Sequence, residues 1–264
     1  MNLILILIFL LLITVTYFLF STKHEYKIPK VIHQTFSHVN LPDEIKFVMN
    51  ENKKKCPECE FKFYSDSDRE IFIKNNFKKE VYDAYKKINP IYGAMKADFF
   101  RYCVLYKEGG IYLDIKSSLL DDPFKYIKED DICILDLKRN DLEPWRIYKP
   151  TYEQWLLIFQ KGHPYLAKMI LQMIHYINIK FEPRIHGIER LNTKQKILHV
   201  TGPDAFTKAI ESENRILHRN IDYNIIAIIY KTDYKKMYQM NNMKHYSEYD
   251  EPLYINYNSR DQYF

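Results

Sequence analysis

Glycine is scarce in this chain, with only six residues among 264. Two of them, Gly109 and Gly110, are adjacent and separate a helical pattern from a β-rich run that ends in Asp114. A glycine-poor chain keeps such a pair where the backbone needs torsions that other residues resist. The scarcity therefore excludes glycine-rich linkers and directs attention to this one turn and to the carboxylate that follows it.

A strong excess of one charge is also missing. The formal net charge is +5, and the lysines and arginines are scattered along the chain. A nucleic-acid partner is not indicated, because such proteins concentrate basic residues in patches or stripes. The mild positive balance suits a small anionic substrate.

Cysteine is sparse, and the sequence contains only one closely spaced pair. Of the four cysteines, Cys56 and Cys59 form the sequence C-P-E-C, whereas Cys103 and Cys133 are isolated. A structural zinc site needs a second ligand pair, which the sequence does not supply. Two free thiols or a local disulfide are the readings that remain for Cys56 and Cys59.

The N-terminus carries the one long apolar run, from Leu3 to Phe20, with no charge before Lys23. Its length approaches the ~20 residues that span a bilayer. A cleaved signal peptide is the alternative, but the basic n-region and small-residue cleavage site of such peptides are missing. We expect a single-pass membrane anchor at 1–22, with the bilayer as partner of 3–20, and one domain at 23–264.

The orientation of this anchor stays unresolved. Lysines follow the apolar run and none precedes it, so positive-inside counting places the C-terminal body in the cytoplasm. No N-x-S/T glycosylation sequon is present to argue for a lumenal face.

Hydrophobic periodicity and turn residues predict alternating strands and helices. The expected strands are 31–34, 60–64, 111–113, 131–137, 197–200 and 225–230, and the expected helices are 43–54, 67–74, 77–87, 91–106, 165–179 and 204–211. This alternation indicates a layered α/β fold. Ligands of open α/β sheets bind beyond the carboxyl ends of the strands, where Asp114 is expected to lie.

The helix at 91–106 has the clearest apolar stripe, and Asp98 and Arg101 lie off that stripe. Residues three apart share a helix face, so these two form a pair. A solvated ion pair of that spacing stabilises a helix by only a few tenths of a kcal/mol and needs no function. The nearby Gly-Gly turn and Asp114 favour another reading, in which three charged groups surround one crevice.

The stretch A-M-K-A-D-F-F-R-Y-C-V-L-Y-K-E-G-G-I-Y-L-D at 94–114 resembles the sugar-binding region that contains the DXD motif, as in glycosyltransferase family 32 of the α-1,6-mannosyltransferase and capsular-polysaccharide type. Flanking segments are similar as well: I-P-K-V-I-H-Q-T-F at 28–36, F-Y-S-D at 63–66, G-H-P at 162–164 and T-G-P at 201–203. The resemblance covers about 28–210.

This resemblance implies a GT-A-like nucleotide-binding sheet flanked by helices. It implies transfer of a hexose, with retention, from a GDP- or UDP-linked sugar to a hydroxyl of a glycan acceptor. Asp98, Arg101 and Asp114 would contact the donor, and Gln34 or Thr35 the base or ribose. A Golgi or endoplasmic-reticulum membrane, or a host membrane associated with a virus, would be the location.

The chain departs from the family where the motif should end. It reads Asp114-Ile115-Lys116, and a lysine replaces the second carboxylate, which usually binds the divalent metal of the leaving diphosphate. Asp114 and His245 could still hold Mn²⁺ or Mg²⁺, or the Lys116 ammonium could itself stabilise the diphosphate. Asp114 and Lys116 are therefore the catalytic candidates, and a catalytically inactive relative that binds a glycan or a nucleotide at the membrane is the alternative.

Overall fold

The computed structural model describes residues 26–138, 150–184, 190–229 and 246–257. The expected membrane anchor at 1–22 and the candidate ligand His245 lie outside these residues. Within the described part, no helix combines the length and the apolar character that crossing a membrane requires.

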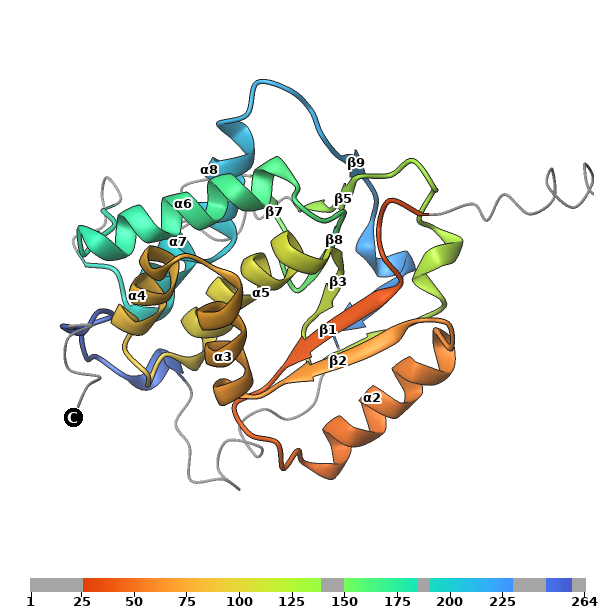
Figure 1. Cartoon of the computed structure of the whole chain (residues 1–264), viewed down its shortest axis with the longest axis horizontal. Helices are drawn as coiled ribbons and strands as arrows, with labels where there is room; N and C mark the ends of the chain where they lie inside the picture. Colours follow the sequence, from red (N-terminus) through yellow and green to blue (C-terminus); the bar gives the residue numbers. More distant parts are fainter. Residues whose placement is uncertain (1–25, 139–149, 185–189, 230–245, 258–264) are drawn as a thin grey trace, which may run out of the picture.

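A six-stranded mixed sheet forms the centre of the molecule (Figure 1), in the order β2-β1-β3-β8-β5-β9. Its strands are β1 (Val31–Thr35), β2 (Glu60–Tyr64), β3 (Gly110–Leu113), β5 (Cys133–Leu135), β8 (Leu156–Phe159) and β9 (Arg219–Asn220). Strand β1 runs parallel to both β2 and β3, whereas β8 is antiparallel to β3. The carboxyl ends of β1, β2 and β3 therefore meet the amino end of β8 at one edge.

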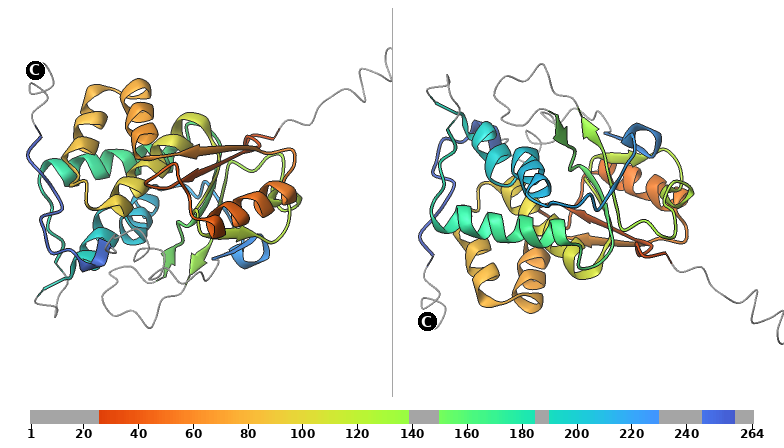
Figure 2. Two further views of the ribbon diagram at one scale, coloured as in Figure 1. Left: turned by 90° about the horizontal axis from the view of Figure 1, so that it is seen from below. Right: turned by 90° about the horizontal axis from the view of Figure 1, so that it is seen from above.

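Helices cover both faces of this sheet, and Figure 1 shows α2 on one side and α5 and α6 on the other. The helices are α2 (Asp43–Lys55), α3 (Asp66–Asn76), α4 (Lys79–Lys87), α5 (Gly93–Glu108), α6 (Pro164–Asn178), α7 (Thr193–Val200) and α8 (Pro203–Glu211). In both views of Figure 2, α3, α4 and α6 lie toward one end of the long axis and α2 toward the other. The expected layered α/β class is confirmed.

Side-chain alternation along the strands supplies a separate core on each face. On β3, Tyr112 packs with the helices α4 to α8, whereas Ile111 and Leu113 pack on the opposite face. Small two-stranded sheets extend the fold: β4 (Ser117–Leu119) pairs with β10 (Ala227–Ile229), and β6 (Leu137–Lys138) pairs with β7 (Thr151–Tyr152).

The Gly109–Gly110 pair joins α5 to β3 with φ angles of 71° and 93°, which L side chains rarely adopt. The space around these two glycines is also too small for a side chain. A Cβ on Gly109 would lie 2.6 Å from the backbone nitrogen of Lys161, and one on Gly110 would lie 2.5 Å from the carbonyl oxygen of Val31. The expected special torsions are confirmed, and the tight turn fixes how α5 lies over β3.

The strand expected at 197–200 is wrong, because these residues end helix α7. A short apolar run fits either element by pattern alone. A capping box at the start of α7 favours the helix. The Asn192 side chain accepts from the backbone N–H of Gln195, and the Gln195 side chain accepts from the backbone N–H of Asn192. Ile197 and Val200, three apart, then share the face that packs into the core.

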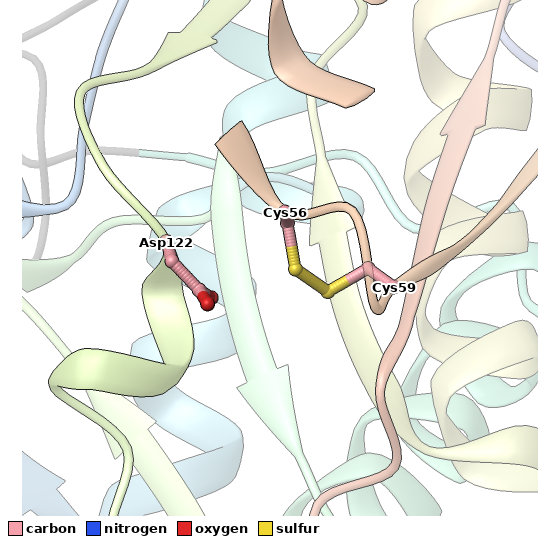
Figure 3. Close-up of side chains that lie close together, drawn as sticks. All are labelled: Cys56, Cys59 and Asp122. Carbon is pink, nitrogen blue, oxygen red and sulfur yellow. A yellow bond between two sulfur atoms is a disulfide. The ribbon is translucent and has the colours of Figure 1, made fainter. Parts of the chain in front are cut away.

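Cys56 and Cys59 are joined by a disulfide between the end of α2 and the start of β2. Asp122 lies beside them (Figure 3), and its carboxylate accepts from the backbone N–H of Phe124. Among the described residues, these three form the single group of His, Cys, Asp or Glu side chains spaced to hold a metal ion. Because the two sulfur atoms are bonded to each other, the local disulfide is confirmed as the reading of this pair.

Candidate active site

A cavity of about 590 Å³ opens at the sheet edge where β1, β2 and β3 end and β8 begins. Helices α3, α5, α7 and α8 also contribute to its wall. Its polar and charged lining includes Thr35, His38, Asp66, Arg69, Asp98, Arg101, Asp114, Lys116, Glu153 and Gln154. The crevice expected from the sequence, with Asp98, Arg101 and Asp114 around it, is therefore present.

Arg101 is the centre of a buried hydrogen-bond network. Its Nη2 atom lies 3.0 Å from Oδ1 of Asp98 and 3.1 Å from Oδ1 of Asp114. Its Nη1 atom donates to the backbone oxygen of Gln154 at 2.8 Å and to the Gln154 Oε1 atom at 2.9 Å. The guanidinium carbon also lies 4.7 Å from the centre of the Tyr112 ring. Because Arg101 and Asp98 are both buried, a solvated surface ion pair does not describe them.

Thr201 completes this network from the turn between α7 and α8. Its hydroxyl donates to Oδ2 of Asp98 at 2.9 Å, so each oxygen of that carboxylate has a partner. Burial raises the pKa of Asp98 to about 6, although Arg101 and Thr201 act in the opposite direction. Burial opposes the charge of Arg101, but Tyr112, Asp98 and Asp114 raise the pKa of the guanidinium above its ordinary value.

Asp114 and Lys116 lie in a tight turn rather than on a strand. Strand β3 ends at Leu113, and the backbone N–H of Ser117 donates to the backbone oxygen of Asp114 at 2.8 Å. Strand alternation therefore does not set the directions of these two side chains. The turn still brings both side chains to the cavity wall. The Asp114 side chain is 39% exposed, whereas burial lowers the pKa of Lys116, opposed by Asp114.

Thr35 and Gln34 differ in position although they are neighbours on β1. Thr35 lines the cavity, and its hydroxyl donates to the backbone oxygen of Tyr64 at 2.6 Å. Gln34 projects to the opposite face of the strand and is absent from the cavity lining. It is 1% exposed, and its side-chain amide has no hydrogen-bond partner among the described residues. Of these two candidates, the structure brings only Thr35 to the cavity.

The described carboxylates of the cavity form a poor set of ligands for a divalent cation. Asp98 and Asp114 both contact Arg101, Asp66 pairs with Arg69, and Glu153 lies 3.4 Å from Lys138. Mn²⁺ and Mg²⁺ at a nucleotide site need one or two carboxylates that can join the substrate phosphates, and each of these four carboxylates already contacts a cationic side chain. His245 lies outside the described residues. The donor set that is described therefore does not fit the expected metal.

Three contributors to this network were not assigned from the sequence. Gln154 and Tyr112 hold Arg101 in place, and Thr201 holds Asp98. Thr201 lies in the T-G-P segment, which resembled a family landmark without a role. Gln154 immediately precedes the apolar run 155–159, whose pattern was a usable but overlooked strand signal.

Comparison with known proteins bears directly on this cavity. Residues 25–132, which include α5, β3 and the turn at Asp114, match the family model "Glycosyltransferase sugar-binding region containing DXD motif". The match covers less than half of the chain, and it includes Asp98, Arg101 and Asp114. The resemblance stated from the sequence is confirmed, and these matches support the enzyme class that it implied, a glycosyltransferase.

Relatives of this glycosyltransferase region include two proteins of Schizosaccharomyces pombe. An initiation-specific alpha-1,6-mannosyltransferase is 26% identical over 206 residues, which cover 72% of this chain and 50% of the relative. Inositol phosphoceramide mannosyltransferase 3 is 33% identical over 150 residues, which cover 54% of this chain and 36% of the relative. The chain thus spans about a third to a half of the length of the curated relatives it matches.

A solved structure agrees with the fold of this glycosyltransferase region. The structure titled "PaToxG Glycosyltransferase" superposes with a TM-score of 0.50 at 16% sequence identity, covering 71% of this chain and 70% of that one. At this identity the match concerns the fold alone. It agrees with the mixed sheet and its flanking helices.

Proposed function

We propose that the chain transfers a hexose from a nucleotide sugar to a hydroxyl of a glycan acceptor, with retention of the anomeric configuration. The observation that carries the proposal is the Asp98–Arg101–Asp114 network at the open edge of the sheet, inside the matched family region. The names of the fungal relatives favour mannose as the hexose. A GDP- or UDP-linked donor is the expected form.

The reaction balances without an oxidant or a reductant. The bond between the anomeric carbon and the β-phosphate oxygen breaks, and its electron pair leaves with the nucleoside diphosphate. The acceptor oxygen forms the new bond to the anomeric carbon, and its proton passes to the departing diphosphate. The products are a glycoside and a nucleoside diphosphate, so stabilising negative charge on the leaving group is the main electrostatic task.

The cavity residues can divide this task by their chemistry. Arg101 presents a planar guanidinium, which suits a diphosphate, although two carboxylates already hold it in place. Asp114 is partly exposed and can accept from sugar hydroxyls at the cavity mouth. Asp98 is buried behind Arg101, so we assign it to positioning the guanidinium more than to direct contact. We assign Thr35, which lines the cavity at the end of β1, to the ribose or the base.

The membrane anchor at 1–22 remains a proposal, and the disulfide suggests its orientation. Disulfides persist in oxidising compartments and are rare in the cytosol. The Cys56–Cys59 bond therefore supports placement of the body at 23–264 on the lumenal or extracellular side, against the positive-inside count. Protease protection of the chain in sealed microsomes tests this. Degradation without detergent would place the body in the cytoplasm instead.

A donor screen tests the proposed activity. The full chain, purified in detergent, is incubated with GDP- and UDP-linked hexoses and a panel of glycan acceptors, and release of the nucleoside diphosphate is measured with Mn²⁺, with Mg²⁺ and with EDTA. We expect release from at least one donor, and an NMR spectrum of the product then reports the anomeric configuration. Binding of nucleotide without release under any condition would favour the alternative, an inactive relative that binds its ligand at the membrane.

A further inference from the structure

The turn after β3 places a lysine where the family motif places a carboxylate. Asp114 and Lys116 both line the cavity, and the hydrogen bond from Ser117 N to Asp114 O closes the turn that carries them. Lys116 is half-buried and lines the cavity. At the place of the second carboxylate in the motif, the chain therefore carries a side chain of opposite charge.

The charges along the cavity make this reversal meaningful. Among its described lining residues, the carboxylates of Asp66, Asp98, Asp114 and Glu153 face the cations Arg69, Arg101 and Lys116. An aspartate in place of Lys116 would make the cavity more negative by two elementary charges. That difference equals the charge of one divalent cation, and bound cations are often the largest local charges in such sites. Lys116 therefore supplies positive charge that an aspartate at this position would gain only by binding a metal ion.

The poor set of metal ligands around Asp114 agrees with this charge balance. Asp114 contacts Arg101, and the other described carboxylates of the cavity each have a cationic partner of their own. Lysine is an established binder of phosphate as a compact point charge. Resting on the proposed function, we propose that Lys116 takes the place of the divalent cation, so that this chain binds and releases its nucleoside diphosphate without a metal.

The test measures nucleotide binding and donor turnover side by side in the full chain. Calorimetry with GDP and with UDP is performed in EDTA and in Mn²⁺, and release from the donor found in the screen is followed under the same conditions. The variants are Lys116→Asp, which restores the D-x-D spacing, and Lys116→Gln, which removes the charge alone. Lys128→Asp, an exposed site outside the cavity lining, is the matched control for reversing a charge.

We expect the wild type and Lys128→Asp to bind equally well in EDTA and in Mn²⁺. Lys116→Gln should bind about ten- to a hundredfold more weakly in both buffers, because a charged hydrogen bond to phosphate is lost. Lys116→Asp should lose binding in EDTA and recover it in Mn²⁺, because one or two carboxylates plus substrate phosphates suffice to hold such an ion. Unfolding temperatures of both Lys116 variants confirm that each one is folded.

Three results would overturn this proposal. Wild-type binding and turnover that vanish in EDTA and return with Mn²⁺ would refute the role of Lys116 while leaving the glycosyltransferase intact. An unchanged affinity in Lys116→Gln would do the same. Neither binding nor release for any donor, in any buffer, would instead remove the proposed function itself, and this inference with it.

Discussion

Arg101 of α5 donates to the carboxylate of Asp114, the first residue after β3, across 3.1 Å. Asp114 follows Arg101 by thirteen positions along the chain, and the Gly109–Gly110 turn lies between them. The bond therefore ties the helix to the strand end at the open edge of the sheet. It links a buried cation of the cavity to the partly exposed carboxylate that we propose contacts the sugar.

Replacing Arg101 by methionine should destabilise the protein strongly. The change leaves Asp98 buried without its cation, and breaking a buried ion pair in this way costs about 3–5 kcal/mol. The double variant Asp98→Asn/Arg101→Met should regain part of that stability, since no unpaired charge is then left buried. Urea unfolding measures both effects. Equal stability of the single and double variants would contradict the pairing.

Thr201 should position Asp98 through its hydroxyl. Valine has a similar shape but no hydroxyl, so in Thr201→Val the Asp98 carboxylate loses a buried hydrogen-bond donor. This loss should lower the free energy of unfolding by about 1–3 kcal/mol. We expect lower kcat as well, because Arg101 is then less firmly oriented. Thr201→Ser keeps the hydroxyl and should restore both quantities. If the serine variant behaves like the valine variant, the methyl group rather than the hydroxyl is what matters.

Asp98 should give the protein a measurable dependence on pH. Its pKa is raised by burial from 3.8 to about 6, so between these values the folded state binds a proton that the unfolded state does not. This contribution to stability is fully present below pH 3.8 and is lost as the pH rises through about 6. Above that pH, the ionised carboxylate should hold Arg101 and support activity.

The pH effect of Asp98 is best measured as a difference from Asp98→Asn. Buried His33 and His163, whose pKa values burial lowers to about 4, act oppositely, since their contributions are lost as the pH falls. Both histidines are present in both proteins and cancel in the subtraction. The unfolding free energy of the wild type should fall relative to that of the variant as the pH rises from 3.8 to about 6. A constant difference would show that Asp98 does not titrate there.

The Cys56–Cys59 disulfide should matter for stability and not for the donor. Because it closes a loop of only four residues, the loop-closure relation gives about 2 kcal/mol for its removal. Neither cysteine lines the cavity. The double variant Cys56→Ser/Cys59→Ser should therefore unfold at a lower temperature while its nucleotide affinity stays unchanged. A weaker nucleotide affinity would show that the disulfide affects the cavity residues, with α2, which ends beside it, as the connecting element.

Much of this site could be predicted because its signals are local. The apolar stripe of 91–106, the Gly-Gly stop and the strand at 111–113 follow from periodicity and backbone torsions, and all three are confirmed. The pairing of Asp98 with Arg101 follows from helix spacing, and the structure adds that both are buried. The roles of Asp114, Lys116 and Thr35 toward a substrate stay predictions.

The features that sequence patterns missed depend on contacts between distant segments. Gln154 lies 53 residues from Arg101, and Thr201 lies 103 residues from Asp98, so no local periodicity links either pair. The end of helix α7 was predicted as a strand because the four residues I-L-H-V at 197–200 fit both periods, although the sequence also contains the capping-box residues Asn192 and Gln195. The resemblance of the segment 28–36 predicts Gln34 at the donor, but side chains alternate along β1, so Gln34 points to the face opposite Thr35.

The most direct test of the donor site compares Asp114→Asn with the wild type, using the donor that the screen identifies. We predict that release of nucleoside diphosphate falls about 10²- to 10³-fold, as when one electrostatic contact of an active site is removed. Stability should change little, because the Asp114 side chain is 39% exposed and Arg101 keeps Asp98 and Gln154. Asp121→Asn, which breaks an exposed pair with Lys125, is the control and should keep full activity. Equal rates for Asp114→Asn and the wild type would contradict the claim that this cavity is the donor site.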